Sequence, residues 1–232
     1  MNAVVYLSYT GNSRKVASYV ARKLSFPCLD LHETKERDFE HLLFVAPVHA
    51  ERLPDEAISF LKEAKAEEMI IVATYGRMNH GNAIFEVQKK FHLPLVGAAY
   101  FPTRHSYLKD DLYEAPYGRL DDLGNAFGKG RYIIVPESED TFGRGLFPKL
   151  RARFAVHIQA NKDCAHCGAC NKACPFGAIV DGKIDNHKCI RCLACVKACP
   201  SGAIDFTLAK TLARYLAKPK REDVLVYVGS NE

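Results

Sequence analysis

The first 100 residues alternate between short apolar runs and longer stretches in which apolar residues recur every three or four positions. The runs predict buried strands and the recurring pattern predicts amphipathic helices. We expect strands at residues 3–7, 27–31, 42–46, 69–73 and 95–100, with helices near 13–24, 54–64 and 82–91. Alternating strands and helices predict an α/β fold with a doubly wound parallel sheet, whose ligands lie at the carboxyl ends of the strands.

The pattern is weaker beyond residue 100. We expect a helix at 119–127, a short strand at 132–135, further helices at 146–158 and 208–216, and a β-prone run at 224–228 that suits a sheet edge. These features predict three segments: residues 1–158 with an insertion at about 101–140, a small domain at 159–206, and a tail at 207–232.

Eight of the nine cysteines form two copies of Cys-x-x-Cys-x-x-Cys-x-x-x-Cys-Pro, 25 residues apart. This spacing is typical of 4Fe-4S ligation, in which three closely spaced thiolates hold one cluster and the fourth reaches another. Zinc usually takes paired Cys-x-x-Cys units across a longer spacer, and disulfides need a secreted protein. We therefore expect two 4Fe-4S clusters, which must organise a segment too short to bury much apolar area. The ninth cysteine, Cys28, is expected to be a small buried hydrophobic residue.

Residues 161–206 resemble the clostridial-type two-cluster ferredoxins, an α+β family, with every ligand position matched. In that family the ligation crosses between the two repeats. The resemblance implies that the first cluster is held by Cys164, Cys167, Cys170 and Cys199. It implies that the second cluster is held by Cys174, Cys189, Cys192 and Cys195.

The loop after the first strand is rich in hydroxyl groups and contains Gly11. Hydroxyls, a glycine that permits close approach, and the N–H groups of a helix start together make a phosphate cradle. The loop has neither the lysine of a nucleoside-triphosphate loop nor the Gly-x-Gly-x-x-Gly of a dinucleotide loop. The alternative is a helix capped by Asn12 or Ser13 without a ligand.

This loop resembles the FMN-phosphate loop of flavodoxins, and the order of strands and helices over the first 130 residues is similar as well. The resemblance implies a sheet order of 2-1-3-4-5 and bound FMN. Its phosphate would lie against Ser8, Tyr9, Thr10, Gly11, Asn12 and Ser13. Its ring would lie between two loops, formed by Pro47, Val48, His49 and Ala50 and by Thr74, Tyr75, Gly76 and Arg77. The chain has no Trp, so Tyr75 or His49 would supply the stacking surface.

Composition sets the expected surroundings. Hydrophobic residues at 48% and charged residues at 25% are ordinary for a soluble protein. No apolar run approaches the roughly 20 residues of a membrane helix, and the N-terminus does not resemble a signal peptide. We expect a cytoplasmic protein in a reducing, anaerobic setting, with no membrane or nucleic-acid partner. The densest basic stretch, Arg144 to Arg153, is expected to be a solvated face, with a docking patch as the alternative.

Taken whole, the chain resembles the flavodoxin–ferredoxin fusion proteins of anaerobes. We expect a low-potential electron carrier that passes electrons between FMN, two 4Fe-4S clusters and redox partner proteins. One rival is a flavoenzyme that reduces a small molecule at the FMN, with residues 101–140 as a lid and His105 or His49 as the acid. A second rival is a docking domain that holds no flavin.

Overall fold

The computed structural model describes residues 1–138 and 148–229. They divide into two compact units. The first contains residues 1–138 and 220–229, and the second contains residues 148–219. The sequence placed a boundary at residue 158 and gave residues 207–232 a segment of their own. In the structure the second unit interrupts the first, because the chain returns after Pro219 to complete the first unit.

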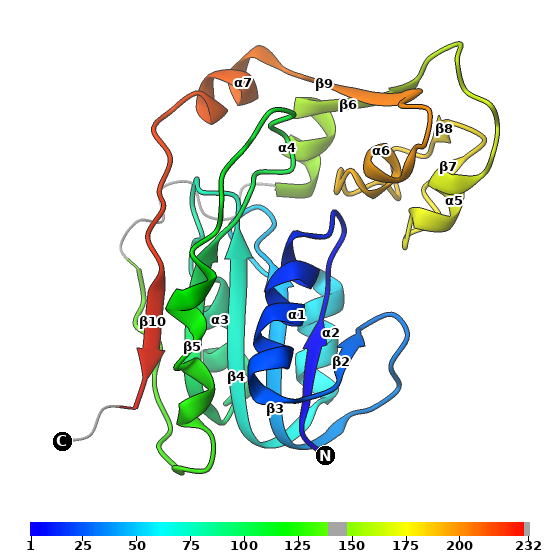
Figure 1. Cartoon of the computed structure of the whole chain (residues 1–232). Coiled ribbons are helices and arrows are strands. Elements are labelled where there is room, and N and C mark those ends of the chain that lie inside the picture. Colours follow the sequence, from blue (N-terminus) through cyan, green and yellow to red (C-terminus); the bar gives the residue numbers. More distant parts are fainter. Residues whose placement is uncertain (139–147, 230–232) are drawn as a thin grey trace. The chain divides into compact units, whose positions relative to one another are not determined.

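The first unit is built on a six-stranded sheet in the order β10-β5-β4-β3-β1-β2 (Figure 1). Its five parallel strands are β1 (Ala3–Tyr6), β2 (Cys28–Asp30), β3 (Asp38–Pro47), β4 (Lys65–Tyr75) and β5 (Leu95–Pro102). The predicted order 2-1-3-4-5 is confirmed. The 224–228 run forms β10 (Leu225–Val228), which pairs antiparallel with β5 at the sheet edge.

Helices cover both faces of this sheet. They are α1 (Asn12–Leu24), α2 (Asp55–Glu63) and α3 (Ala83–Phe91). Because successive strand residues point to opposite faces, Val5 packs in the core under α2 and α3, and Val4 packs in the core under α1. Two 3₁₀ turns, η1 (Tyr117–Leu120) and η2 (Leu123–Ala126), lie on the α1 face. No helix in the described ranges is long and apolar enough to span a membrane.

Three local predictions were wrong. The helix expected at 119–127 is replaced by η1 and η2, where Gly118 and Gly124 weaken a continuous helix. The strand expected at 132–135 is absent from the described structure there, since the N–H of Val135 donates to the Gln88 side chain. Cys28 is exposed because β2 is an edge strand. The end of the expected insertion, residues 139 and 140, and Arg144 lie outside the described residues.

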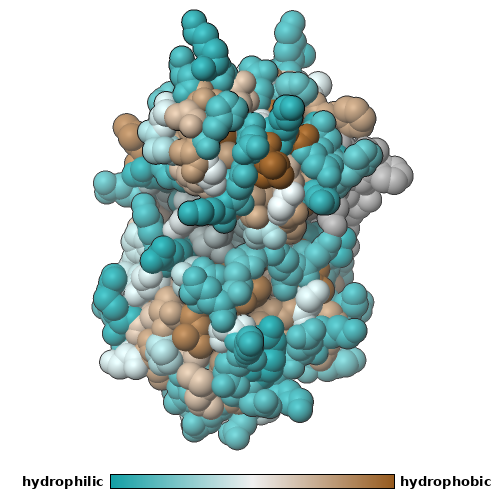
Figure 2. Space-filling view, turned by 90° about the vertical axis from the view of Figure 1, so that its right-hand side faces the viewer, coloured by the Kyte–Doolittle hydropathy of each residue, from teal (hydrophilic) through white to brown (hydrophobic). Residues whose placement is uncertain are grey.

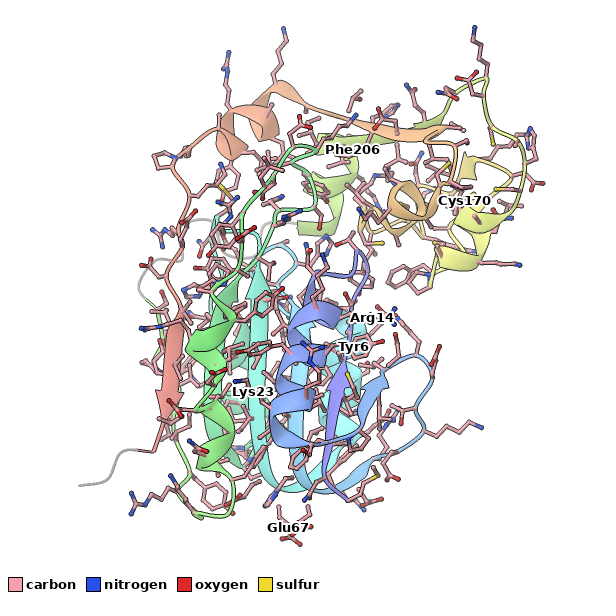
Figure 3. All side chains as sticks on the ribbon, in the orientation of Figure 1. Tyr6, Arg14, Lys23, Glu67, Cys170 and Phe206 are labelled. Carbon is pink, nitrogen blue, oxygen red and sulfur yellow. The ribbon has the colours of Figure 1, made fainter. Side chains whose placement is uncertain are left out.

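The second unit consists of short elements around two antiparallel strand pairings. Its helices are α4 (Pro148–Ala155), α5 (Ala169–Ala173), α6 (Ala194–Ala198) and α7 (Lys210–Leu216). Its strands are β6 (Val156–Ala160), β7 (Ile179–Val180), β8 (Lys183–Ile184) and β9 (Ile204–Leu208), with β6 paired to β9 and β7 to β8. The helix expected at 146–158 ends at Ala155, because Val156 pairs with Leu208. Figure 3 labels Cys170 on α5 and Phe206 on β9.

Candidate functional site

The loop between β1 and α1 is open at its glycine. Gly11 adopts a left-handed φ of 90° at the N-cap of α1, and a Cβ added there would meet no atom within 4 Å. The first N–H groups of an α-helix have no acceptor within the helix, and the helix dipole favours an anion at this end. Backbone approach at Gly11 and the first turn of α1 therefore suit a phosphate group.

The polar side chains of this loop have two different environments. Thr10 is partly exposed, and its Oγ1 lies 3.1 Å from Ser106 Oγ. Asn12 donates from Nδ2 to the Arg104 carbonyl at 2.9 Å. Both contacts bring the loop after β5 next to the β1 loop. The Thr10 hydroxyl is thus placed where a ligand can reach it.

Ser13 is instead only 2% exposed, and its Oγ lies 2.8 Å from Thr74 Oγ1. Thr74 in turn donates to the Ala46 carbonyl at 3.5 Å. With that direction, the Ser13 hydroxyl donates to Thr74 and holds the start of α1 against the ends of β3 and β4. Ser13 therefore orders the loop, whereas Ser8 and Thr10 are partly exposed. The Tyr9 hydroxyl points away, donating to Glu56 Oε2 at 2.6 Å.

The loops after β3 and β4 are joined by a hydrogen bond from the Val48 N–H to the Thr74 carbonyl, at 2.7 Å. His49 is partly buried, and its N–H donates to the Arg52 carbonyl at 2.8 Å. Tyr75 is 2% exposed, and its hydroxyl donates to the Asp223 carbonyl at 2.7 Å. Its ring also meets that of His80 edge-on. Of the two expected stacking residues, His49 is therefore the more accessible one.

His105 lies in the loop after β5, packed on Gly76 of the β4 loop. Its Nδ1 accepts the Tyr107 N–H at 3.1 Å, so the proton of the neutral ring is on Nε2. Burial lowers the pKa of His105 to about 4, with Lys220 and Arg77 adding to the effect against Asp111. The ring is then neutral at pH 7 and has no imidazolium proton to give. This environment does not support His105 as a general acid.

A cluster around Arg77 joins three segments of the first unit. Arg77 is 7% exposed and donates from Nη1 to Glu222 at 2.8 Å and from Nη2 to Asp111 at 2.5 Å. Its guanidinium carbon lies 4.2 Å from the centre of the Tyr113 ring. The Arg77 carbonyl accepts the Arg221 N–H at 2.8 Å. The β4 loop, the 105–113 segment and the returning tail are thus held together.

Asp111 is the buried acceptor of this cluster. Burial alone would raise its pKa, but hydrogen bonds from Arg77 and from the N–H groups of His105 and Tyr113 hold the pKa below its usual range. Asp111 and Glu222 were not found from the sequence, because each lies beside another acidic residue in a short polar stretch that is distant along the chain from residue 77. No periodic pattern or motif marks them.

Gly76→Ala tests the contact between these loops. An added Cβ would lie 2.5 Å from Cδ2 and 3.2 Å from Cα of His105, so the two loops must separate. We expect the free energy of unfolding to fall by about 1–3 kcal/mol. Urea denaturation measures this, with Gly118→Ala as the control, since a Cβ there meets nothing within 4 Å. Equal effects of the two substitutions would contradict the packing described.

The eight repeated cysteines line two separate cavities of the second unit. One cavity is lined by Cys174, Cys189, Cys192 and Cys195, together with apolar side chains such as Ile158 and Phe176. The other is lined by Cys164, Cys167, Cys170 and Cys199, together with His166, Asp181 and Ser201. Each cavity thus takes three cysteines from one repeat and the fourth from the other. This is the crossed grouping that the resemblance to ferredoxins implies.

Local backbone geometry produces the crossing. Cys174 and Cys199 end α5 and α6 in extended conformations, with ψ of 105° and 112°. The proline that follows each of them disfavours the helical region for the residue before it. The fourth cysteine of each repeat is therefore directed away from the other three. Equivalent positions of the two repeats also share backbone geometry, since Gly168 and Leu193, which are 25 residues apart, both have left-handed φ values.

The cavity that contains Cys192 needs positive charge to hold thiolates. Burial, followed by the neighbouring cysteines, raises the pKa of Cys192 to about 12 and that of Cys195 to about 11. Since the thiolate is the form that binds metal, bound cations must offset this cost. The Ala178 N–H donates to Cys174 Sγ at 3.3 Å, a contact of the kind that tunes cluster potentials.

All nine cysteines are free of disulfides. Within residues 1–138 and 148–229, no three His, Cys, Asp or Glu side chains converge as a site for one metal ion. The four cysteines of each group instead line one cavity.

Comparison with known proteins identifies the two units. A family model for a flavodoxin domain matches residues 3–125, and two models for 4Fe-4S binding domains match residues 164–178 and 183–205. The cysteine chemistry is accordingly that of iron–sulfur clusters and not of zinc or disulfides. A search of curated proteins found no match to the sequence.

Two solved structures are similar to parts of the chain. A protein described as a flavoprotein of Bacteroides uniformis ATCC 8492 is 16% identical, with a TM-score of 0.36 over 45% of this chain and 91% of its own. The Trp repressor binding protein of Bacillus subtilis is 11% identical, with a TM-score of 0.34 over 53% of this chain and 97% of its own. The flavodoxin match alone spans more than half of the 232 residues. The chain belongs to the flavodoxin family and is a flavodoxin–ferredoxin fusion, a flavin and iron–sulfur protein of electron transfer.

Proposed function

We propose that this protein is a low-potential electron carrier with one FMN in its first unit and two 4Fe-4S clusters in its second. It would exchange electrons with redox partner proteins in the cytoplasm. The single observation that carries the proposal is the sorting of eight cysteines into two groups of four, in a chain that also has an open phosphate loop. FMN supplies two-electron chemistry that can proceed in single steps, and each cluster supplies one-electron chemistry.

The residues of the chain have distinct roles in this proposal. The N–H groups at the start of α1 and the Thr10 hydroxyl would hold the phosphate, while the buried Ser13–Thr74 contact keeps the loop in place. The eight cysteines would hold the clusters as thiolates. Apolar side chains around the Cys192 cavity, including Ile179 and Leu193, exclude water from it.

The flavoenzyme alternative gains no support from the described residues. His105 is neutral at pH 7 and packed against Gly76. His49 is partly buried, and its backbone N–H donates to the Arg52 carbonyl at 2.8 Å. An electron carrier needs no acid or base at the flavin.

Cofactor analysis of protein purified anaerobically tests the proposal. We expect about eight iron atoms, about eight sulfide ions and about one FMN per chain. Extracted flavin is identified by chromatography, and iron and sulfide are measured by colorimetric assay. About four iron atoms per chain, or FAD or no flavin after reconstitution, would contradict it.

Thr10→Ala is expected to weaken FMN binding about 10-fold to 150-fold, because a charge-assisted hydrogen bond contributes about 1.5–3 kcal/mol. Riboflavin, which has no phosphate, should bind both forms equally. Isothermal titration of each ligand into the flavin-free protein measures this, and Ser59→Ala on the exposed face of α2 is the control. Unchanged FMN affinity would remove Thr10 from the phosphate site.

A further inference from the structure

The net charge of the chain is unevenly divided. Residues 148–219 contain 12 Lys and Arg but only 4 Asp and Glu, a formal charge of +8. Since the whole chain is +5, the remaining residues carry −3. The modest total therefore hides a strongly basic second unit.

In the sequence, most of the excess charge is concentrated at the two ends of the second unit. Residues 148–156 include Lys149, Arg151 and Arg153, and residues 209–219 include Lys210, Arg214 and Lys218, with no acidic residue in either segment. The Ala209 N–H donates to the Ala155 carbonyl at 2.8 Å, so the end of α4 lies beside the start of α7. We call these two segments the basic helix pair.

The basic residues of the α7 segment are exposed. Lys210 and Arg214 lie one turn apart on α7, and Lys218 follows two residues after the helix ends, whereas Leu216 is 2% exposed. Nitrogen-tipped side chains project outward around α7 in Figure 3. Figure 2 shows the side on which α5 and β7 lie in Figure 1, where hydrophilic side chains project between hydrophobic areas. The exposed basic side chains of the α7 segment make its own surface polar and positively charged.

Two arginine contacts place the basic helix pair beside one cysteine cavity. Arg153 of α4 donates to the His187 carbonyl, two residues before Cys189. Arg191, between Cys189 and Cys192, donates from Nε to the Val156 carbonyl at 2.9 Å, directly after α4. Ile158, two residues further along β6, lines the cavity that contains these cysteines. A molecule bound to the pair would therefore lie near the Cys174, Cys189, Cys192 and Cys195 group.

The same segments expose aromatic side chains. Phe154 of α4 is 80% exposed and Tyr215 of α7 is 38% exposed. Aromatic residues and arginine are enriched in protein–protein interfaces, where an apolar centre is surrounded by a polar rim. These two aromatic side chains lie on the same segments as the positive charges.

We propose that the basic helix pair is the docking surface for an acidic redox protein, which exchanges electrons at the cluster held by Cys174, Cys189, Cys192 and Cys195. The inference rests on the proposed function and adds the charge of the partner and the cluster it uses. Opposite charge accelerates encounter and orients the complex, and both effects weaken with salt. The site needs a partner with its own redox centre, which favours a protein over a nucleic acid.

A charge-reversal variant tests this: Lys210→Glu, Arg214→Glu and Lys218→Glu combined. The matched control is Lys62→Glu, Lys89→Glu and Lys90→Glu, which makes the same charge change at exposed positions of the first unit. Anaerobic stopped-flow mixing with a pre-reduced, acidic plant-type ferredoxin gives the second-order rate. We expect the α7 variant to lose about tenfold or more of this rate at low salt, the control to lose little, and only the parent and control to be strongly salt-dependent.

Reduction by dithionite separates this proposal from the proposed function. In a chain without clusters, neither dithionite nor ferredoxin would produce the signal of reduced clusters. If only the docking proposal is wrong, dithionite still reduces the clusters completely in every variant. A variant that combines Lys210→Arg, Arg214→Lys and Lys218→Arg keeps the positive charge. A ferredoxin rate equal to that of the parent would support a role for charge. Equal ferredoxin rates in the α7 variant and its control would overturn the proposal. So would tight oligonucleotide binding that only the α7 changes abolish, since this would assign the surface to nucleic acid.

Discussion

Cys174→Ala is expected to remove the cluster shared with Cys189, Cys192 and Cys195, and to leave the cluster of the Cys164 group in place. The reason is the crossed grouping, in which Cys174 follows α5 but lines the cavity of the second repeat. Without Cys174 this cluster has only three cysteine ligands. They lie in a cavity where burial already raises the pKa of Cys192 and Cys195. About half of the iron and sulfide should be lost.

Iron and sulfide content together with electron paramagnetic resonance of the reduced protein measure this effect. Loss of the magnetic coupling between two reduced clusters would accompany the loss of one of them. Cys28→Ala is the control, because it removes the ninth cysteine, which is exposed on β2 and lines neither cavity. Damage in Cys174→Ala confined to the Cys164 group would reverse the assignment of the fourth ligands.

Arg77→Met is expected to lower the free energy of unfolding of the first unit by about 3–5 kcal/mol, because it leaves a buried carboxylate without its partner. The side chains of Arg77 and Asp111 are only 8% and 5% exposed. The change also removes the contact with Glu222 and so loosens the tail from the β4 loop. Chemical denaturation followed by circular dichroism measures the difference.

The pH dependence of that difference has a defined sign. Asp111 has a lowered pKa in the folded protein, so its pairing stabilises the fold above the ordinary carboxyl pKa of about 4 and is lost as the pH falls below it. The effect of Arg77→Met should be full at pH 7 and shrink below about pH 4. Arg52→Met is the control, since the exposed Arg52–Glu86 pair should contribute less than about 1 kcal/mol. Equal losses in the two variants would contradict the cluster around Arg77.

Much of the fold follows from regular patterns in the sequence. Four of the five parallel strands, β1, β3, β4 and β5, are largely buried, so the sequence shows them as apolar runs, and the sheet order agrees with the flavodoxin family. The iron–sulfur ligands could also be predicted from the sequence, because cluster ligation requires the observed spacing of the cysteines and the prolines that follow them. Both signals depend on short-range repetition within the chain.

The remainder depends on contacts that no local pattern records. The Arg77 cluster joins residues up to 145 positions apart. Ser13 looked like a phosphate donor because of its position in the motif, but the close approach of Thr74 buries its hydroxyl. Tyr75 was expected to offer a stacking surface, yet its hydroxyl donates a hydrogen bond to the Asp223 carbonyl of the returning tail, and the residue is only 2% exposed. Each outcome is set by a segment distant in sequence.

Electron redistribution within a single chain tests the central claim most directly. Flash photoreduction of the flavin under anaerobic conditions, followed at flavin and cluster wavelengths over a range of protein concentrations, separates internal from bimolecular transfer. We expect oxidised clusters to be reduced at a rate that does not change with protein concentration, and NADH or NADPH to reduce neither group rapidly, because the sequence has no dinucleotide fingerprint. A transfer rate that rises in proportion to protein concentration, or rapid reduction by NAD(P)H, would contradict a self-contained electron carrier.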